Sequence, residues 1–127
     1  MKQSVSIIGG GTSALFLAAF LNKSKFEITI YESNNSLGRK FLVAGDGGFN
    51  LTHSEPMDKV VNRYASVHFL KKSLCNFTND DFRFWLESIG INTFVGSSGR
   101  VFPVKDTKPI QVLTAISNKL QEDGVHF

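Results

Sequence analysis

An α/β fold around a parallel sheet is predicted for this 127-residue chain by three successive segments near its start. Residues 4–8 form a short β-branched apolar run that stops at glycine, which is typical of a strand. Residues 12–21 are rich in helix formers and apolar almost all round, which predicts a helix packed on a sheet. Residues 26–31 alternate apolar and polar side chains, which predicts a second strand. Together they form a βαβ unit over residues 3–32, in which the two strands run parallel.

The turn between the first strand and the helix carries the glycine pattern of a Rossmann-type dinucleotide-binding fold. Gly9 permits the tight turn, Gly11 lets the backbone approach a pyrophosphate, and Ala14 keeps the helix close to the sheet. Backbone N–H groups around Gly11 face the phosphates at the positive end of the helix dipole, and the hydroxyls of Thr12 and Ser13 add donors. We therefore predict that these five residues bind the ADP half of a dinucleotide.

An acidic residue stands where this fold places the partner of the adenosine ribose. Glu32 lies 23 residues after Gly9, at the end of the second predicted strand. Its carboxylate can accept hydrogen bonds from both ribose hydroxyls, and the same charge disfavours the 2′-phosphate of NADP. The alternative is a glycine-rich turn in an unrelated α/β domain, with Glu32 merely solvated. The pattern predicts an ADP-ribose site but does not separate FAD from NAD.

A long loop and inserted helices are predicted after the βαβ unit. Residues 33–54 hold glycines among polar residues and predict a loop, with one helical turn over 39–43. Residues 56–90 predict a helical insertion, whose last helix is capped by Thr78 and stopped by Gly90. The predicted helices of this insertion cover residues 57–64, 67–74 and 79–89.

Residues 92–123 predict a small β-hairpin followed by a helix. The hairpin spans residues 92–102 and has a four-residue loop. The helix is capped by Thr107 and ends at Gly124, and residues 125–127 look like the opening of a further strand. The inner face of this helix is predicted to consist of Ile110, Leu113, Ile116, Ser117 and Leu120.

Composition and charge exclude several classes of protein. A hydrophobic fraction of 42% excludes a disordered chain, and no run of apolar residues is long enough to span a membrane. The net charge of +3 is too small and too scattered to indicate a nucleic-acid-binding surface. The one cysteine, Cys75, which we place in the core, excludes an internal disulfide and a cysteine-based zinc site and suits a reducing cytoplasm. The lone histidines do not predict a metal site. A weaker alternative is RNA binding through a face that carries Arg39, Lys40, Lys71 and Lys72.

Two later motifs resemble blocks of one bacterial flavoprotein family. Residues 38–53 read GRKFLVAGDGGFNLTH, and residues 99–103 read GRVFP. Both are similar to blocks of the FAD-binding flavoproteins known as aminoacetone oxidase-like proteins or NAD(P)/FAD-dependent oxidoreductases, which include reductases of oxo-bile acids. The commoner family pattern reads SGGGRCN, and here Gly48 and Phe49 stand in place of its Arg and Cys. The resemblance identifies the chain as the N-terminal portion of a member of a sub-branch.

The resemblance implies an FAD-dependent oxidoreductase in which the flavin carries the redox step and NAD(P)H is a possible electron donor. Gly47 and its neighbours let backbone amides approach a flat ring, and Asn50 offers a donor and an acceptor to a flavin edge. Arg39 or Lys40 can lie against the pyrophosphate or the adenosine half of FAD. The alternative is that these two are surface charges and that the glycines only shape a turn.

No catalytic side chain is predicted, but two residues adjoin the predicted flavin loop. His53 is expected to be a surface or core residue, with tuning of the flavin or the substrate as the alternative. Arg100 can bind an anionic group of a substrate or form a structural salt bridge.

Two other functions remain open at this point: an NAD-binding dehydrogenase domain and a non-catalytic dinucleotide-binding module. Because members of the family it resembles are much longer, residues 1–127 are expected to be the N-terminal part of an FAD/NAD(P)-binding domain. The C-terminal part of the same protein would then be its missing partner, and the 127 residues alone would bind FAD weakly and lack turnover. We expect a bacterial, cytoplasmic protein with a small-molecule substrate, without nucleic acid or membrane as a partner.

Overall fold

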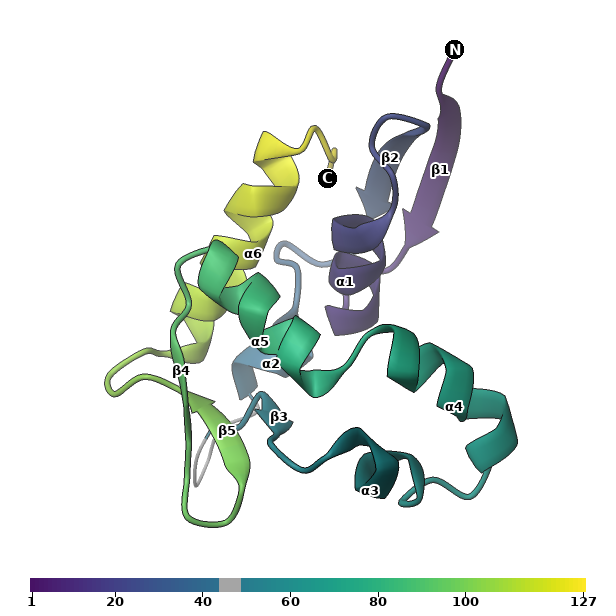
Figure 1. The fold of residues 1–127 in the computed structure, drawn as a ribbon. Coiled ribbons are helices and arrows are strands. Elements are labelled where there is room, and N and C mark those ends of the chain that lie inside the picture. Colours follow the sequence, from purple (N-terminus) through teal and green to yellow (C-terminus); the bar gives the residue numbers. More distant parts are fainter. Residues whose placement is uncertain (44–48) are drawn as a thin grey trace. The chain divides into compact units, whose positions relative to one another are not determined.

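The computed structural model describes residues 1–43 and 49–127 (Figure 1). The chain divides into two compact units. We call Met1–Asp46 with Thr107–Phe127 the terminal unit, and Gly47–Asp106 the middle unit. Among the described residues, no helix is long and apolar enough to cross a membrane.

The terminal unit is built on a parallel βαβ arrangement. Strands β1 (Gln3–Ile8) and β2 (Phe26–Tyr31) pair in parallel and are connected by helix α1 (Thr12–Phe20). Side chains at alternate positions share one face of the sheet, so the apolar ones gather on the side that is buried. The opposed apolar pairs are Val5 with Ile28 and Ile7 with Ile30. The predicted α/β fold with a parallel sheet is confirmed.

A second crossover returns the chain to this sheet. Helix α6 (Pro109–Glu122) contacts α1 and the short helix α2 (Arg39–Val43). After α6, the backbone of His126 runs parallel to β2: the Ile30 N–H donates to the His126 carbonyl (2.8 Å), and the His126 N–H donates to the Ile28 carbonyl (3.0 Å). The predicted opening of a further strand is therefore confirmed. The buried apolar residues of this unit are Ile7, Leu15, Ala18, Ile28, Ile30, Val112, Leu113, Ile116, Leu120 and Val125.

One glycine joins the start of α2 to both α6 and the turn that precedes α1. Gly38 is buried and has φ +64°, and its N–H donates to the carbonyl of Gly10 (2.8 Å). A Cβ at this position would lie 2.6 Å from Cδ1 of Leu113 on α6. Glycine is required here both by the backbone conformation and by the close approach of α6.

The middle unit contains a small antiparallel sheet in the order β3-β5-β4 (Figure 1). Its strands and helices have the following bounds: β3 Thr52–His53, α3 Met57–Val61, α4 Val67–Asn76, α5 Asn79–Ser88, β4 Thr93–Val95 and β5 Arg100–Pro103. The hairpin of β4 and β5 is confirmed, with Val95 opposite Val101. The caps of α5 are also confirmed: the Thr78 hydroxyl accepts the Asp81 N–H (3.2 Å), the Asp81 carboxylate accepts the Thr78 N–H (2.8 Å), and Gly90 follows the helix with φ +84°.

The structure corrects five details of the sequence interpretation. The predicted loop contains β3, whose two residues pair with β5, and α3 ends at Val61. Lys108, not Thr107, is the N-cap of α6, because Pro109 occupies the first helical position and fixes the cap directly before it. Cys75 is exposed, because none of the residues of α4 is buried. On α6, Val112 is buried and Ile110 is 50% exposed, so the buried stripe begins at Val112, two residues later than predicted.

Candidate dinucleotide site

The turn between β1 and α1 contains three glycines that differ in what the surrounding protein requires of them. Gly9 has φ +92°, a conformation that favours glycine, and its N–H donates to the carbonyl of Tyr31 (2.7 Å). Gly10 is buried, and a Cβ there would overlap Cδ2 of Leu37. Gly11 has an ordinary extended conformation, and a Cβ there would meet no described atom within 4 Å. The fold therefore accounts for the first two glycines, whereas Gly11 leaves open space above the backbone.

The first backbone N–H groups of α1 have no side-chain cap among the described residues. Gly11 is the N-cap, and its carbonyl accepts the first helical bond from the Leu15 N–H (3.1 Å). In the part of the chain that the structure describes, no side chain caps this end, and no acidic residue stands in the first turn. The N–H groups of Thr12, Ser13 and Ala14 point outward from the helix end without intrahelical acceptors. Such an end binds anions through these donors and through the helix dipole.

Glu32 is held beside the glycine turn by a network of hydrogen bonds. Its Oε2 accepts the Gly10 N–H (2.7 Å). Its Oε1 accepts both the backbone N–H (2.8 Å) and the side-chain Nδ2 (2.7 Å) of Asn34, and the Ser33 hydroxyl lies at 3.3 Å. These bonds, those from the backbones of Asn34 and Gly10 above all, lower the pKa of Glu32 from 4.5 to about 2. The carboxylate is therefore ionised and oriented at neutral pH.

Asn34 is a member of this network that the sequence interpretation missed. Its Oδ1 accepts a hydrogen bond from Nη1 of Arg39 (3.3 Å), so Arg39 is linked through Asn34 to Glu32. The sequence does hold a signal, because an Asn two residues after an acidic strand end favours a turn closed by its own backbone and side-chain bonds. Lys40 is exposed on the same short helix as Arg39.

The predicted site residues do not all fall in one unit. The terminal unit brings together the residues of the glycine turn, Glu32 and Arg39. Asn50 is exposed in the middle unit, and Gly47 lies outside the described residues. His53 and Arg100 belong to the middle unit and lie opposite each other in β3 and β5.

An apolar hollow of about 550 Å³ lies next to Glu32 at the carboxyl ends of the strands. Ile8, Tyr31 and Phe127 line it and are 83%, 55% and 47% exposed, and Gly9 and Glu32 form its polar border. Ligands of open α/β sheets bind outside the carboxyl ends of the strands. An apolar surface beside a fixed carboxylate suits a flat base attached to a ribose.

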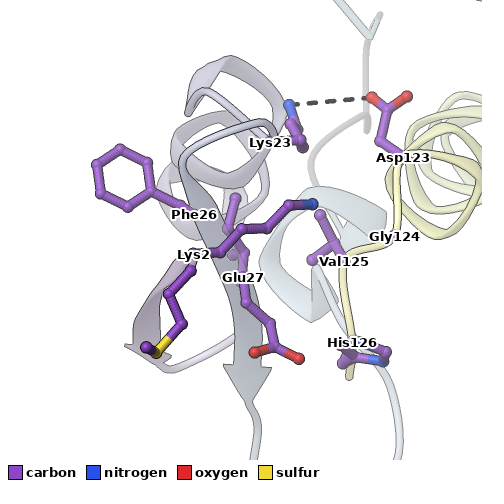
Figure 2. Close-up of a pocket in the computed structure, with 10 residues that line it drawn as sticks. Lys2, Lys23, Phe26, Glu27, Asp123, Gly124, Val125 and His126 are labelled. Carbon is purple, nitrogen blue, oxygen red and sulfur yellow. Dashed lines mark ion pairs between the residues drawn. The ribbon is translucent and has the colours of Figure 1, made fainter.

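A second hollow of the terminal unit lies at the opposite, amino ends of the strands (Figure 2). Lys23 pairs there with Asp123 (3.9 Å), and Asp123 also pairs with Lys119. Burial lowers the pKa of Lys23, and the charge of Asp123 opposes this shift. These ion pairs tie the turn before β2 to the end of α6, and none of these groups belongs to the glycine turn.

The pKa of Glu32 predicts how acid acts on this site. Because the pKa of the folded state is lowered, the Glu32 bonds stabilise the fold above the ordinary pKa of 4.5 and are lost as the pH falls toward 2. We expect Glu32→Gln to lower the melting temperature at neutral pH, and this difference from the wild type to shrink between about pH 5 and pH 2. Thermal denaturation across this range measures it, with Glu27→Gln, at an exposed position of β2, as the control. A difference that does not change with pH would contradict the assignment.

The fold and the sequence both relate the chain to known proteins. Residues 3–127 match the family model described as HI0933-like protein Rossmann domain. A ribosomal RNA dihydrouridine synthase of Haemophilus influenzae is 35% identical over 98 residues, which are 76% of this chain and 24% of that protein. A ribosomal RNA dihydrouridine synthase of Escherichia coli is 27% identical over 125 residues (95% of this chain, 30% of that protein). A 3-dehydro-bile acid delta(4,6)-reductase of Clostridium scindens is 28% identical over 123 residues (95% and 29%).

The solved structures add a likeness of fold. The crystal structure of THI4 from Thermovibrio ammonificans superposes with a TM-score of 0.58 and 21% identity, over 98% of this chain and 37% of that chain. The chain spans less than a third of the length of the three curated relatives. With the glycine turn, the parallel βαβ unit and the family match in agreement, the chain belongs to the HI0933-like flavoprotein family and forms a Rossmann dinucleotide-binding domain of that family.

Proposed function

We propose that this chain binds the ADP half of FAD and that the protein is a flavin-dependent oxidoreductase. The observation that carries the proposal is Gly11, which no contact within the described protein explains and which stands at an uncapped helix end. A pyrophosphate seated on this end would take the space above Gly11 and accept the N–H groups of the first turn. A dinucleotide thus accounts for the one glycine of the turn that the fold leaves unexplained.

The neighbouring groups fit the rest of the ADP moiety. Oε2 of Glu32 accepts only the Gly10 N–H among the described residues and would take a ribose hydroxyl, and the negative charge of the carboxylate disfavours the 2′-phosphate of NADP. The apolar hollow beside it would take the adenine, and Arg39 or Lys40 would approach the phosphates. We assign Gly47 and Asn50 to the flavin end on the family motif alone. When bound, the flavin supplies the hydride chemistry, and the residues named here bind and orient it.

The substrate of this protein is not inferred from the relatives, because their names refer to different substrates. Two are named for ribosomal RNA and one for a 3-dehydro-bile acid. Membership of the family therefore supports flavin-dependent redox chemistry but not one class of substrate. We infer a small-molecule substrate, since the net charge of +3 is spread over both units.

The experiment that tests the proposal uses the protein at its full natural length. We expect the purified protein to be yellow, with flavin absorption bands in the near-UV and the blue, and to be bleached by an electron donor. Glu32→Gln should raise the Kd for FAD by about tenfold or more, because a hydrogen bond to a charged group contributes about 1.5–3 kcal/mol. Glu27→Gln, near the amino end of β2, is the matched control and should bind FAD like the wild type.

Two results would replace this proposal with another. A colourless protein that binds NADH and is not reconstituted by FAD is an NAD-binding dehydrogenase. A protein whose bound flavin is reduced by no donor is a non-catalytic dinucleotide-binding module.

A further inference from the structure

The middle unit contains a hollow of about 490 Å³ that is lined by its own residues. Its lining includes one arginine from β5, one arginine from the turn after α3, a histidine, a carboxylate and an aromatic ring. The residues that matter are Arg100, Arg63, His53, Glu55, Tyr64 and Asn79. The volume lies within the range of small-molecule sites.

One wall of this hollow is His53, whose ring is fixed by backbone groups on both sides. Its Nδ1 accepts the Glu55 N–H (3.1 Å), so Nε2 carries the proton and donates to the Ser98 carbonyl (3.2 Å). Gly99 has φ +77°, and a Cβ there would lie 2.7 Å from the ring. The ring is therefore fixed close against the hairpin loop, and both of its nitrogens have backbone partners.

Asn79 and the ion pair between Glu55 and Arg63 connect the segments that line the hollow. Nδ2 of Asn79 donates to the carbonyls of His53 (2.5 Å) and Glu55 (3.0 Å), which joins the start of α5 to the end of β3. The Glu55 carboxylate is engaged by Arg63 through both oxygens, at 2.6 Å to Nε and 2.9 Å to Nη2. These bonds to Arg63 lower the pKa of Glu55, which therefore stays ionised.

Arg100 is the group in the hollow that these contacts leave unused. It lies directly opposite His53 in the β3–β5 pair, so the two side chains are on the same face. Within the described residues it forms no ion pair, and the Glu55 carboxylate is bound to Arg63. Two guanidinium groups against one carboxylate leave the lining with an excess positive charge. Arg100 is exposed and lines the hollow, and Tyr64 lines the same space.

We propose that this hollow binds the oxyanion group of a small organic ligand, a carboxylate or a phosphate, with Arg100 as the anchor and Tyr64 as a flat apolar wall. Arginine suits this task, because its fork of donors matches both groups in a bidentate manner. Thr52, which also lines the hollow, is two residues after Asn50 of the predicted flavin loop. That the ligand is the substrate of the oxidoreductase rests on the proposed function, whereas the binding of an anion does not.

The test titrates the full-length protein with inorganic phosphate and, separately, with benzoate, at low ionic strength, and follows binding by NMR chemical shifts. We expect saturable binding of at least one of them, with Arg100→Gln raising its Kd by about tenfold or more and Arg100→Lys by less. Whether phosphate or benzoate binds more tightly shows whether the hollow prefers a phosphate or a carboxylate group. Lys105→Gln, an exposed residue just after β5 and outside the lining, is the matched control and should leave Kd unchanged.

Circular dichroism, the melting temperature and an FAD titration serve as controls for this test. Circular dichroism and the melting temperature show whether each variant is folded, and Arg100→Lys replaces Arg100→Gln if the latter is not. Equal Kd values in Arg100→Gln and Lys105→Gln, or no saturable binding of either anion, would overturn the proposal. The FAD titration separates the two proposals, because Arg100→Gln should keep the FAD affinity of the wild type, and anion binding should persist even if FAD does not bind.

Discussion

Replacing Gly11 with alanine is expected to abolish tight FAD binding while it leaves the stability of the fold nearly unchanged. The backbone at Gly11 has φ −74° and ψ 175°, which alanine adopts freely, and the added methyl would meet no described atom within 4 Å. The free energy of unfolding should change by less than about 1 kcal/mol. In the complex, the methyl would occupy the space of the pyrophosphate. We expect Kd for FAD to rise by about a hundredfold or more, equivalent to the loss of about two charge-assisted hydrogen bonds.

Gly10→Ala is the matched control, because there the methyl meets the protein itself. It would overlap Leu37 and lie 3.1 Å from Cβ of Glu32. Overpacking of this kind costs about 1–3 kcal/mol, so this variant should lose stability in urea denaturation. FAD titration and urea denaturation of both variants separate the two roles. If Gly11→Ala binds FAD as the wild type does, no phosphate lies over this turn and the proposed site is wrong.

The glycine turn was accessible to sequence analysis because its requirements are local. A left-handed residue, an uncapped helix start and an acid at the next strand end all follow from residue types at fixed spacing. The caps of α5 were predicted for the same reason, since Thr78 and Gly90 act on their own helix. What the sequence could not show is the close approach at Gly10, which depends on where Leu37 packs. It also could not show that Glu32 is already bonded to the Gly10 N–H.

The elements that were missed depend on partners distant in the sequence. Strand β3 is two residues long and is defined only by its pairing with β5, nearly fifty residues later in the sequence. Two residues are too few to show the alternation of apolar and polar side chains that predicts a strand. The fixed ring of His53 has the same origin, because its acceptor is the carbonyl of Ser98. Cys75 was placed in the core because its helical surroundings include apolar residues, but those residues do not show whether another element covers them.

Gly38→Ala is expected to destabilise the terminal unit strongly. Alanine in the left-handed region costs about 1–2 kcal/mol, and the methyl would lie 2.6 Å from Leu113 on α6, where overpacking adds about 1–3 kcal/mol. The sum is a loss of about 2–5 kcal/mol in the free energy of unfolding, measured by urea denaturation. Because the Gly38 N–H also holds the Gly10 carbonyl, displacement of α2 should weaken FAD binding as well.

Gly124→Ala separates the two causes of this loss. Gly124 has φ +78° at the end of α6, but a Cβ there would meet nothing within 4 Å, so only the conformational cost of about 1–2 kcal/mol remains. The excess loss in Gly38→Ala over Gly124→Ala then measures the packing of α6 against Gly38. In a double-mutant cycle, Leu113→Ala should recover part of the loss in Gly38→Ala, because it removes the atoms that the methyl meets. Equal losses at the two glycines, with additive effects of Leu113→Ala, would show that Gly38 is required for its backbone conformation alone.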